Sequence, residues 1–180
     1  PISKLEDLKG MKFRTVGLSV DMYTAMGCAV NALPGAEIVP AMDRGLLDGA
    51  EFNNASSDRA LGFQDVSKVC MLQSFHQNAE QFEILFNKDK YNALPAKLKA
   101  TIDNAVEAAN TDMLWKAYDR YSKDYIWLQT EAKVKFYKTP DVILQKQLEI
   151  WEQIAAKKSA ENPMFKEILE SQIAFAKRAV

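Results

Sequence analysis

Apolar residues recur along the chain at two spacings, and each spacing predicts a different kind of element. Short apolar runs between glycines and polar clusters predict strands at residues 11–18, 46–52, 69–72 and 81–86. Apolar positions three or four residues apart predict amphipathic helices at residues 21–33, 37–44 and 57–68. Strands and helices alternate, so the chain is predicted to adopt an α/β fold.

The carboxy-terminal half is predicted to be helical. From Leu94 to Leu128, apolar or aromatic residues recur regularly and predict one helix of roughly 35 residues and about 50 Å. Such a helix exceeds the width of a small lobe, so it crosses two lobes or projects. After a short strand at 133–137, Thr139-Pro140 and Asn162-Pro163 start two more helices, with Thr139 as the expected N-cap. The apolar positions of the first of these helices are Val142, Leu144, Leu148, Trp151, Ile154 and Ala155.

Composition narrows the class of protein. The 180 residues are 48% hydrophobic and 26% charged, which suits one sizeable core or two small lobes. The net charge is −1 and the charges are interspersed, so a nucleic-acid partner is not expected. No uninterrupted apolar stretch approaches the roughly 18 residues that span a bilayer, so we expect a soluble chain. The first ten residues do not resemble a signal peptide, and we expect the chain to be part of a longer protein.

Cysteine and histidine are too sparse for most metal and nucleophile chemistry. Cys28 and Cys70 are isolated thiols without C-x-x-C spacing, and we interpret both as small buried hydrophobic residues. His76 is the single histidine, which argues against a zinc site of the His and Cys type. A Ser-His-Asp triad would need His76 as its base. We therefore expect chemistry based on oxygen ligands, or none.

The run Gly45–Phe52 presents an acidic side chain, Glu51, at the end of a short apolar segment, as a strand end aimed at a cleft would. From the run alone, Glu51 is either a ligand for a positive group or a solvated loop charge. One alternative is a hydrolase that uses Asp48, Glu51 and His76. Asp48 and Glu51 are three residues apart on a strand and point to opposite faces, which argues against a cooperating carboxylate pair. Another alternative is an interaction module built from the helices after Pro140 and Pro163.

Several segments, in this order, carry a resemblance to a known family: Asp7–Arg14, Gly35–Ile38, Gly45–Phe52, Ala60–Phe63, Asn92–Pro95 and Ser171-Gln172. In these segments the chain resembles the extracytoplasmic solute-binding proteins of tripartite ATP-independent periplasmic (TRAP) transporters. It is most similar to the branch that binds keto acids and lactate. The resemblance implies that this is the C-terminal half of such a protein, with the signal peptide in the other half. The implied fold is the C-terminal part of a two-lobed, type II-like periplasmic binding protein with a long lobe-bridging helix and a helical C-terminus.

The resemblance also implies a division of the chain and a function. Residues 1–50 would belong to the second ligand-binding lobe, 51–93 to crossover strands and a cleft segment, 94–132 to the bridging helix, and 133–180 to a short strand and the C-terminal helices. The implied function is non-enzymatic: a periplasmic protein encloses a small 2-oxo or 2-hydroxy carboxylate, such as pyruvate or lactate, between its lobes. It delivers this ligand to the membrane subunits of the permease. The apolar C-terminal helices also allow a homodimer.

Site residues are carried over at the matching positions. Arg14 would clamp the ligand carboxylate, because a guanidinium forms a planar bidentate pair with it. Glu51 and the carbonyl of Phe52 would hold a bridging cation, sodium or calcium, and no catalytic cofactor is implied. Family members commonly have tryptophan where this chain has Phe52, so its pocket shape departs from theirs. Asn53 and His76 are expected to contact the substrate.

Overall fold

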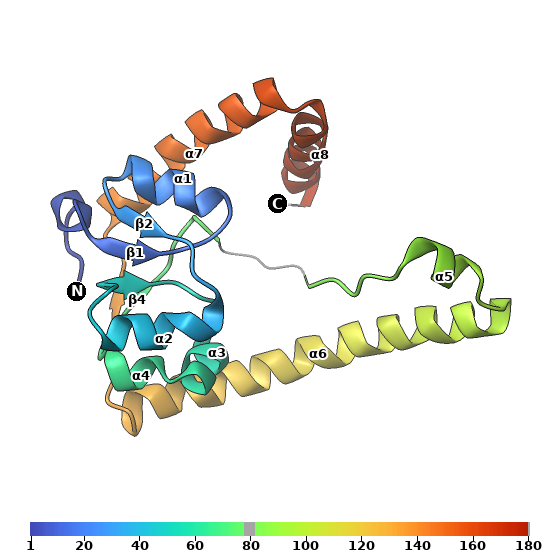
Figure 1. Cartoon of the computed structure of the whole chain (residues 1–180), viewed down its shortest axis with the longest axis horizontal. Helices are drawn as coiled ribbons and strands as arrows, with labels where there is room; N and C mark the ends of the chain where they lie inside the picture. Colours follow the sequence, from blue (N-terminus) through green and yellow to red (C-terminus); the bar gives the residue numbers. More distant parts are fainter. Residues whose placement is uncertain (78–81, 180) are drawn as a thin grey trace. The chain divides into compact units, whose positions relative to one another are not determined.

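The computed structural model describes residues 1–77 and 82–179, which form two compact units (Figure 1). Unit 1 comprises residues 1–52, 69–77 and 136–179, and unit 2 comprises residues 53–68 and 82–135. Each unit is therefore assembled from segments that are distant in the sequence.

Unit 1 is an α/β unit with helices before, between and after its strands. Its elements are η1 (Leu5–Leu8), β1 (Lys12–Arg14), α1 (Leu18–Ala25), β2 (Ala29–Asn31), α2 (Gly35–Asp43), β3 (Gly49–Ala50), β4 (Val69–Leu72), β5 (Lys135–Lys138), α7 (Asp141–Glu161) and α8 (Pro163–Ala179). Unit 2 is helical, with α3 (Ala55–Leu61), α4 (Phe63–Val66), α5 (Lys88–Asn92) and α6 (Ala96–Thr130).

The main sheet of unit 1 is parallel and has the strand order β2-β1-β3. Phe13 in the central strand pairs with Val30 on one side and with Gly49 on the other. The chain moves from β1 to β2 in one direction and returns past β1 to β3, so right-handed crossovers place α1 and α2 on opposite faces of the sheet (Figure 1). The carboxyl ends of β1 and β3 consequently meet at one edge of the sheet.

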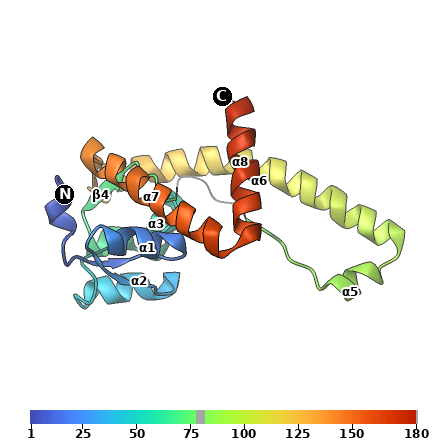
Figure 2. The ribbon, with the colours of Figure 1, turned by 90° about the horizontal axis from the view of Figure 1, so that it is seen from above.

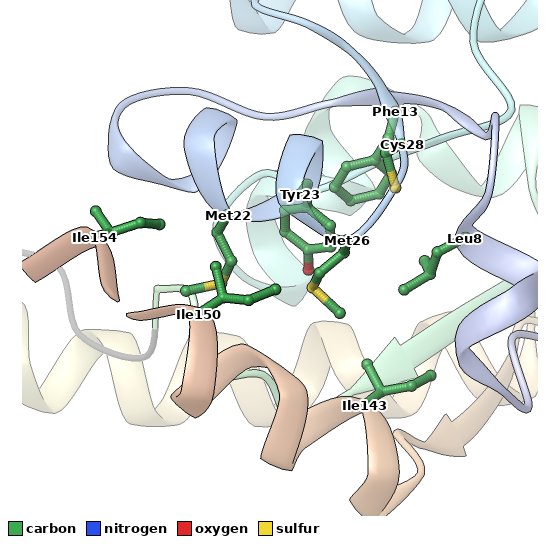
Figure 3. Packing of buried hydrophobic residues seen from close by; sticks show 9 residues of the cluster. All are labelled: Leu8, Phe13, Met22, Tyr23, Met26, Cys28, Ile143, Ile150 and Ile154. Carbon is green, nitrogen blue, oxygen red and sulfur yellow. The ribbon is translucent and has the colours of Figure 1, made fainter. Parts of the chain in front are cut away.

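The core of unit 1 lies between α1 and α7. Figure 3 shows Ile143, Ile150 and Ile154 of α7 facing Met22 of α1 and Met26, which directly follows this helix. These residues pack in one cluster with others from η1, β1 and the turn after α1: Leu8, Phe13, Tyr23 and Cys28. Burial of this apolar surface holds α7 against α1, although these two helices are more than 100 residues apart in the sequence.

The buried face of α7 differs from the predicted one. Val142 and Leu148 are 51% and 38% exposed, whereas the buried residues are Ile143, Leu144, Gln147, Ile150 and Ile154. Thr139 does not cap this helix, because its hydroxyl donates to the Leu72 carbonyl at 2.8 Å and α7 begins after Pro140. The predicted start of the next helix at Asn162-Pro163 is confirmed, since Asn162 Oδ1 accepts the N–H groups at the start of α8. Figure 2 shows α8 turning sharply away from α7 there.

Two predicted helices end earlier than expected. The helix predicted over 21–33 ends at Ala25, a turn with Gly27 at φ 96° follows, and β2 then pairs with β1. Apolar spacing continues through β2, so strand pairing overrides the helical pattern there. The helix predicted over 57–68 is divided into α3 and α4 at Gly62, which adopts the left-handed conformation (φ 86°).

Three predicted strands are also corrected. The strand predicted over 11–18 is only Lys12–Arg14, and the strand predicted over 46–52 is only Gly49–Ala50. Of the strand predicted over 81–86, Gln81 lies outside the described residues and residues 82–86 form no strand. The strand at 69–72, the short strand before Thr139 and the helix of 35 residues are confirmed as β4, β5 and α6.

Further observations bear on the predictions from composition. Cys28 is buried as predicted, whereas Cys70 is only half-buried, and neither forms a disulfide within the described residues. Burial raises the pKa of Cys28 to about 11. Within residues 1–77 and 82–179, no helix is both long enough and apolar enough to cross a membrane.

Candidate functional site

Arg14 lies at the carboxyl end of β1 and only 5% of it is exposed. Its Nε donates to the Leu33 carbonyl at 2.8 Å, and its Nη1 donates to the Glu51 carbonyl at 2.9 Å. Nη2 donates to none of the residues that the structure describes. Two main-chain carbonyls therefore fix the plane of the guanidinium while part of its donor capacity is unused.

Glu51 follows β3 directly and is brought to Arg14 by the sheet. The N–H of Glu51 donates to the Arg14 carbonyl at 3.1 Å, which extends the pairing of β1 with β3 by one residue. The Glu51 Oε1 atom then lies 3.1 Å from Arg14 Nη1, and the Glu51 side chain is 12% exposed. Since both groups are largely removed from water, their charges are only weakly screened.

The imidazole of His76 completes this cluster. Its Nε2 atom lies 3.6 Å from Glu51 Oε2, which is too far for a hydrogen bond. Nε2 is buried and has no hydrogen-bond partner among the described residues. The other ring nitrogen, Nδ1, contacts Ser74 Oγ and lies 3.4 Å from Tyr23 Oη. The ring is thus held through Nδ1, and Nε2 faces the Glu51 carboxylate.

Phe52 forms a wall of the cluster. Its ring centroid lies 5.7 Å from Arg14 Cζ, within the range of a cation–π contact. The ring also packs against Gly35, where an added Cβ would lie 2.7 and 2.9 Å from two ring carbons. Gly35 therefore lacks a side chain because the aromatic ring occupies that space.

Two other predicted residues are placed differently. Asp48 lies at the amino end of β3, where its Oδ2 accepts the N–H of Lys12 at 2.8 Å and its Oδ1 lies 3.6 Å from Lys12 Nζ. Glu51 lies at the other end of the strand, so the structure does not assemble Asp48, Glu51 and His76 into one group. Asn53 belongs to unit 2, and its contact with substrate stays a prediction.

Three polar residues that the sequence reasoning missed surround His76: Tyr23, Ser74 and Gln147. Burial raises the pKa of Tyr23 to about 12, the negative charge of Glu51 adds to this, and hydrogen bonds from Ser74 and Gln147 oppose it. Tyr23 is therefore a neutral hydroxyl at physiological pH. Gln147 was detectable in principle, since it interrupts the apolar spacing of Ile143, Ile150 and Ile154 on one helix face.

The donor atoms of the cluster suit a hard cation only in part. Glu51 offers carboxylate oxygens and Phe52 a main-chain carbonyl, which are the ligands that sodium and calcium prefer. Within the described part of the chain, no three His, Cys, Asp or Glu side chains are grouped as a metal site. A cation at Glu51 would therefore need further oxygen ligands from a bound molecule or from other parts of the protein.

A separate surface cavity of about 610 Å³ lies in unit 2, between α5 and α6. It is lined by Phe86, Lys88, Tyr91, Asn92, Ile102, Asp103, Asn104, Val106 and Glu107. Its Tyr91 hydroxyl already donates to Asp103 at 2.8 Å. This cavity lacks a buried charged group, so the cluster around Arg14 is the stronger candidate for binding a charged ligand.

Comparisons with known proteins agree with the resemblance seen in the sequence. Residues 1–162 match the family model described as bacterial extracellular solute-binding protein, family 7. A monocarboxylate 2-oxoacid-binding periplasmic protein from Nostoc is 28% identical over 177 residues, which cover 98% of this chain and 48% of that protein. The chain thus spans about half the length of this relative.

Solved structures share the fold. The TRAP periplasmic solute-binding protein from Colwellia psychrerythraea, with bound calcium and pyruvate, has a TM-score of 0.92 at 23% identity. Another from Pseudoalteromonas atlantica, with bound sodium and pyruvate, has a TM-score of 0.91 at 24% identity. Each alignment covers 99% of this chain, and 55% and 54% of those chains. The predicted fold class is confirmed, and the chain belongs to family 7 of the bacterial extracellular solute-binding proteins, the solute-binding proteins of TRAP transporters.

Proposed function

We propose that the protein containing this chain is the periplasmic substrate-binding component of a TRAP-type transporter. It binds a small 2-oxo or 2-hydroxy monocarboxylate, such as pyruvate or lactate, at the cluster of Arg14, Glu51 and His76, and passes it to the membrane permease. The observation that carries the proposal is the buried Arg14, whose Nη2 donates to no described residue. The ligands named for the Nostoc, Colwellia and Pseudoalteromonas proteins support this substrate class.

Arg14 neutralises the ligand carboxylate. The Leu33 and Glu51 carbonyls already hold the guanidinium in place, so little side-chain freedom is lost when the ligand binds. The N–H groups of Nη2 donate to the carboxylate, and each such charge-assisted bond contributes roughly 1.5–3 kcal/mol. A lysine lacks the planar fork that this geometry uses.

A bridging cation resolves a repulsion that Arg14 alone leaves. Glu51 Oε1 lies 3.1 Å from the same guanidinium, so an incoming carboxylate would lie close to a second negative charge. The Glu51 carboxylate and the Phe52 carbonyl would hold sodium or calcium there, and the ion would supply the positive charge that screens the two carboxylates from each other. A ligand that offers both a carboxylate and a 2-oxygen would suit such an ion, which favours acids that carry both groups.

The remaining contacts define the pocket. His76 donates from Nε2 to a ligand oxygen, and the Phe52 ring limits the size of the ligand on the side of Gly35. Asn53 adds a polar contact. Binding without turnover is proposed, because Asp48 is separated from Glu51 and His76. After incubation with the full-length protein, the acid should be recovered unchanged, and any product detected by chromatography would favour the hydrolase alternative.

The decisive experiment is calorimetry on the full-length protein with a panel containing pyruvate and lactate. Arg14→Ala should weaken binding by about 100-fold or more, since two charge-assisted bonds are lost. Lys12→Ala is the matched control, because Lys12 is a cation on the same strand that pairs with the half-exposed Asp48. Lys12→Ala should leave the affinity unchanged. Wild-type affinity in Arg14→Ala would overturn the proposal that Arg14 binds the ligand carboxylate.

We also propose that α8 contributes to a homodimer. The helix buries none of its residues, and Met164, Ile168, Ile173 and Phe175 are 68%, 52%, 45% and 63% exposed. Exposed apolar surface of this kind favours association with a partner. Light scattering should give the mass of a dimer for the full-length protein and of a monomer for Ile168→Glu, whereas equal masses would contradict this role.

A further inference from the structure

The loop after β4 is held by a single buried side chain from a distant helix. Gln147 of α7 is 1% exposed, and its Oε1 accepts the N–H of Phe75 at 2.8 Å and the hydroxyl of Ser74 at 3.1 Å. A main-chain N–H can only donate, so the oxygen of Gln147 must face the loop. Its Nε2 then faces Tyr23 and donates to Oη at 3.3 Å.

Tyr23 and Ser74 pass this constraint on to His76. Both hydroxyls lie at the imidazole Nδ1, and the Tyr23 ring meets the His76 ring edge-on with centroids 5.3 Å apart. One turn earlier on α1, the Ser19 hydroxyl donates to the His76 carbonyl at 3.3 Å. The backbone and one edge of the imidazole are therefore fixed before any ligand binds.

The protonation of the ring follows from these contacts. Nδ1 faces the Tyr23 hydroxyl, whose proton is free to be donated to it at 3.4 Å, while Nε2 faces the negative charge of Glu51 Oε2 at 3.6 Å. A carboxylate favours a proton on the nitrogen nearest to it, and the partner of one ring nitrogen sets the role of the other. The neutral imidazole therefore carries its proton on Nε2, a buried donor without a partner in the described residues.

We propose that Gln147 is a positioning residue for ligand binding: through Ser74 and Tyr23 it holds His76 with the Nε2 proton directed at the ligand oxygen beside Glu51. This inference rests on the proposed function and extends it to a residue that does not touch the ligand. It also explains why a glutamine occupies a buried position on an apolar helix face. A leucine would fill that position but could not orient the loop.

The test combines binding with a direct view of the imidazole in the full-length protein. Gln147→Leu should weaken pyruvate binding by about 10-fold, and it should have no further effect in a His76→Ala background. Nitrogen NMR of ¹⁵N-histidine-labelled protein should show the Nδ1 and Nε2 resonances of His76 moving toward each other in Gln147→Leu, because its two tautomers mix. The His76→Ala variant identifies which signals belong to His76. A merely structural role for Gln147 would leave the tautomer unchanged.

Controls separate positioning from general destabilisation. Thr139→Val removes another buried hydrogen bond, to the Leu72 carbonyl at the start of the same loop, and should alter neither affinity nor imidazole signals. If Gln147→Leu does not fold, Ser74→Ala removes the contacts with His76 and Gln147 while leaving the core of α7 intact, and it should reproduce both effects.

The outcomes distinguish this inference from the proposed function. Unchanged affinity and unchanged imidazole signals in Gln147→Leu and Ser74→Ala overturn the positioning role, even when Arg14→Ala abolishes binding. If the wild-type protein binds no acid of the panel, the proposed function fails, and the imidazole signals alone decide whether Gln147 sets the tautomer. Equal loss of affinity from Gln147→Leu with and without His76 would also overturn the role.

Discussion

Each unit of the molecule contains an arginine–carboxylate cluster, and the two clusters differ in how completely their polar atoms are paired. In unit 2, Asp124 is 2% exposed and accepts Arg59 Nη1 and Arg120 Nε, each at 2.8 Å. Arg59 also lies over the Trp127 ring, with Cζ 3.9 Å from its centroid. In unit 1, Arg14 keeps Nη2 without a described acceptor, and Glu51 Oε2 faces an imidazole nitrogen that is too far away to donate.

The comparison separates a structural ion pair from the candidate binding site. A buried charge is stable when its hydrogen bonds are all made, as at Asp124, and such a cluster joins α3 to α6. Donors and acceptors left unpaired at Arg14 and His76 weaken the folded state unless a ligand supplies the missing partners. Pairing, rather than residue type, therefore distinguishes the two clusters.

The largest expected effect comes from removing Asp124 from the fully paired cluster of unit 2. Asp124→Ala should lower the free energy of unfolding by about 3 kcal/mol, because it leaves two arginines without their carboxylate. Urea denaturation of the full-length protein would measure this loss. Ligand affinity should stay at the wild-type value, and a large loss of affinity without a loss of stability would contradict the structural assignment.

At the incompletely paired cluster around Arg14, a substitution should lower ligand affinity rather than stability. Glu51→Gln keeps the shape of the side chain but removes the charge proposed to hold the cation, so binding should weaken by about 2 kcal/mol, roughly 30-fold. Affinity should also lose its dependence on sodium or calcium after chelation. Asp48→Asn is the control, since Asp48 sits on the same strand and faces Lys12. Equal effects of these two substitutions would argue against a cation at Glu51.

A smaller effect is expected from the wall of the site. Gly35→Ala places a Cβ 2.7 Å from the Phe52 ring and should displace it, weakening ligand binding by about 1 kcal/mol, or roughly 5-fold. Calorimetry would measure the change. Phe52→Leu in the Gly35→Ala background should restore part of the affinity by opening the space, and an additive loss would show that the ring does not shape the pocket.

The last prediction concerns pH and distinguishes the two clusters by their effect on stability. Burial opposes the charge of Asp124, but the neighbouring Ser56 side chain and the hydrogen bonds from Arg120 and Arg59 outweigh it and lower the pKa to about 2. The stabilisation is therefore complete above the ordinary value near 4 and is lost as the pH falls toward 2. Urea midpoints of wild type and Asp124→Asn should converge over this interval. A constant difference between them would refute the shift.

The sequence was most informative where a pattern was long or local. A regular apolar spacing over 35 residues predicted α6, and Asn162-Pro163 marked the start of α8. It was misleading at residues 29–31, where helical spacing continues into a strand that pairs with β1. Local periodicity cannot report such pairing, because the partner strand lies elsewhere in the sequence.

At the candidate site, too, some residues could be predicted from the sequence and others could not. Arg14 and Glu51 could be picked out through the family resemblance, and their contact depends on the pairing of β1 with β3. Tyr23 and Gln147 carried no motif, and their contact joins residues 124 positions apart. A glutamine on an apolar helix face was the only trace of this network in the sequence.

The hydrogen bond from Gln147 to Tyr23 has a consequence for the order of folding. The strands that place Arg14 and Glu51 are close in the sequence and can pair early, yet the residue that braces His76 lies almost 100 residues beyond them. Closing a loop of this length is slow relative to local strand pairing. The folding chain therefore passes through a stage in which the charged pair exists without its brace, and His76 is held in place only when α7 docks.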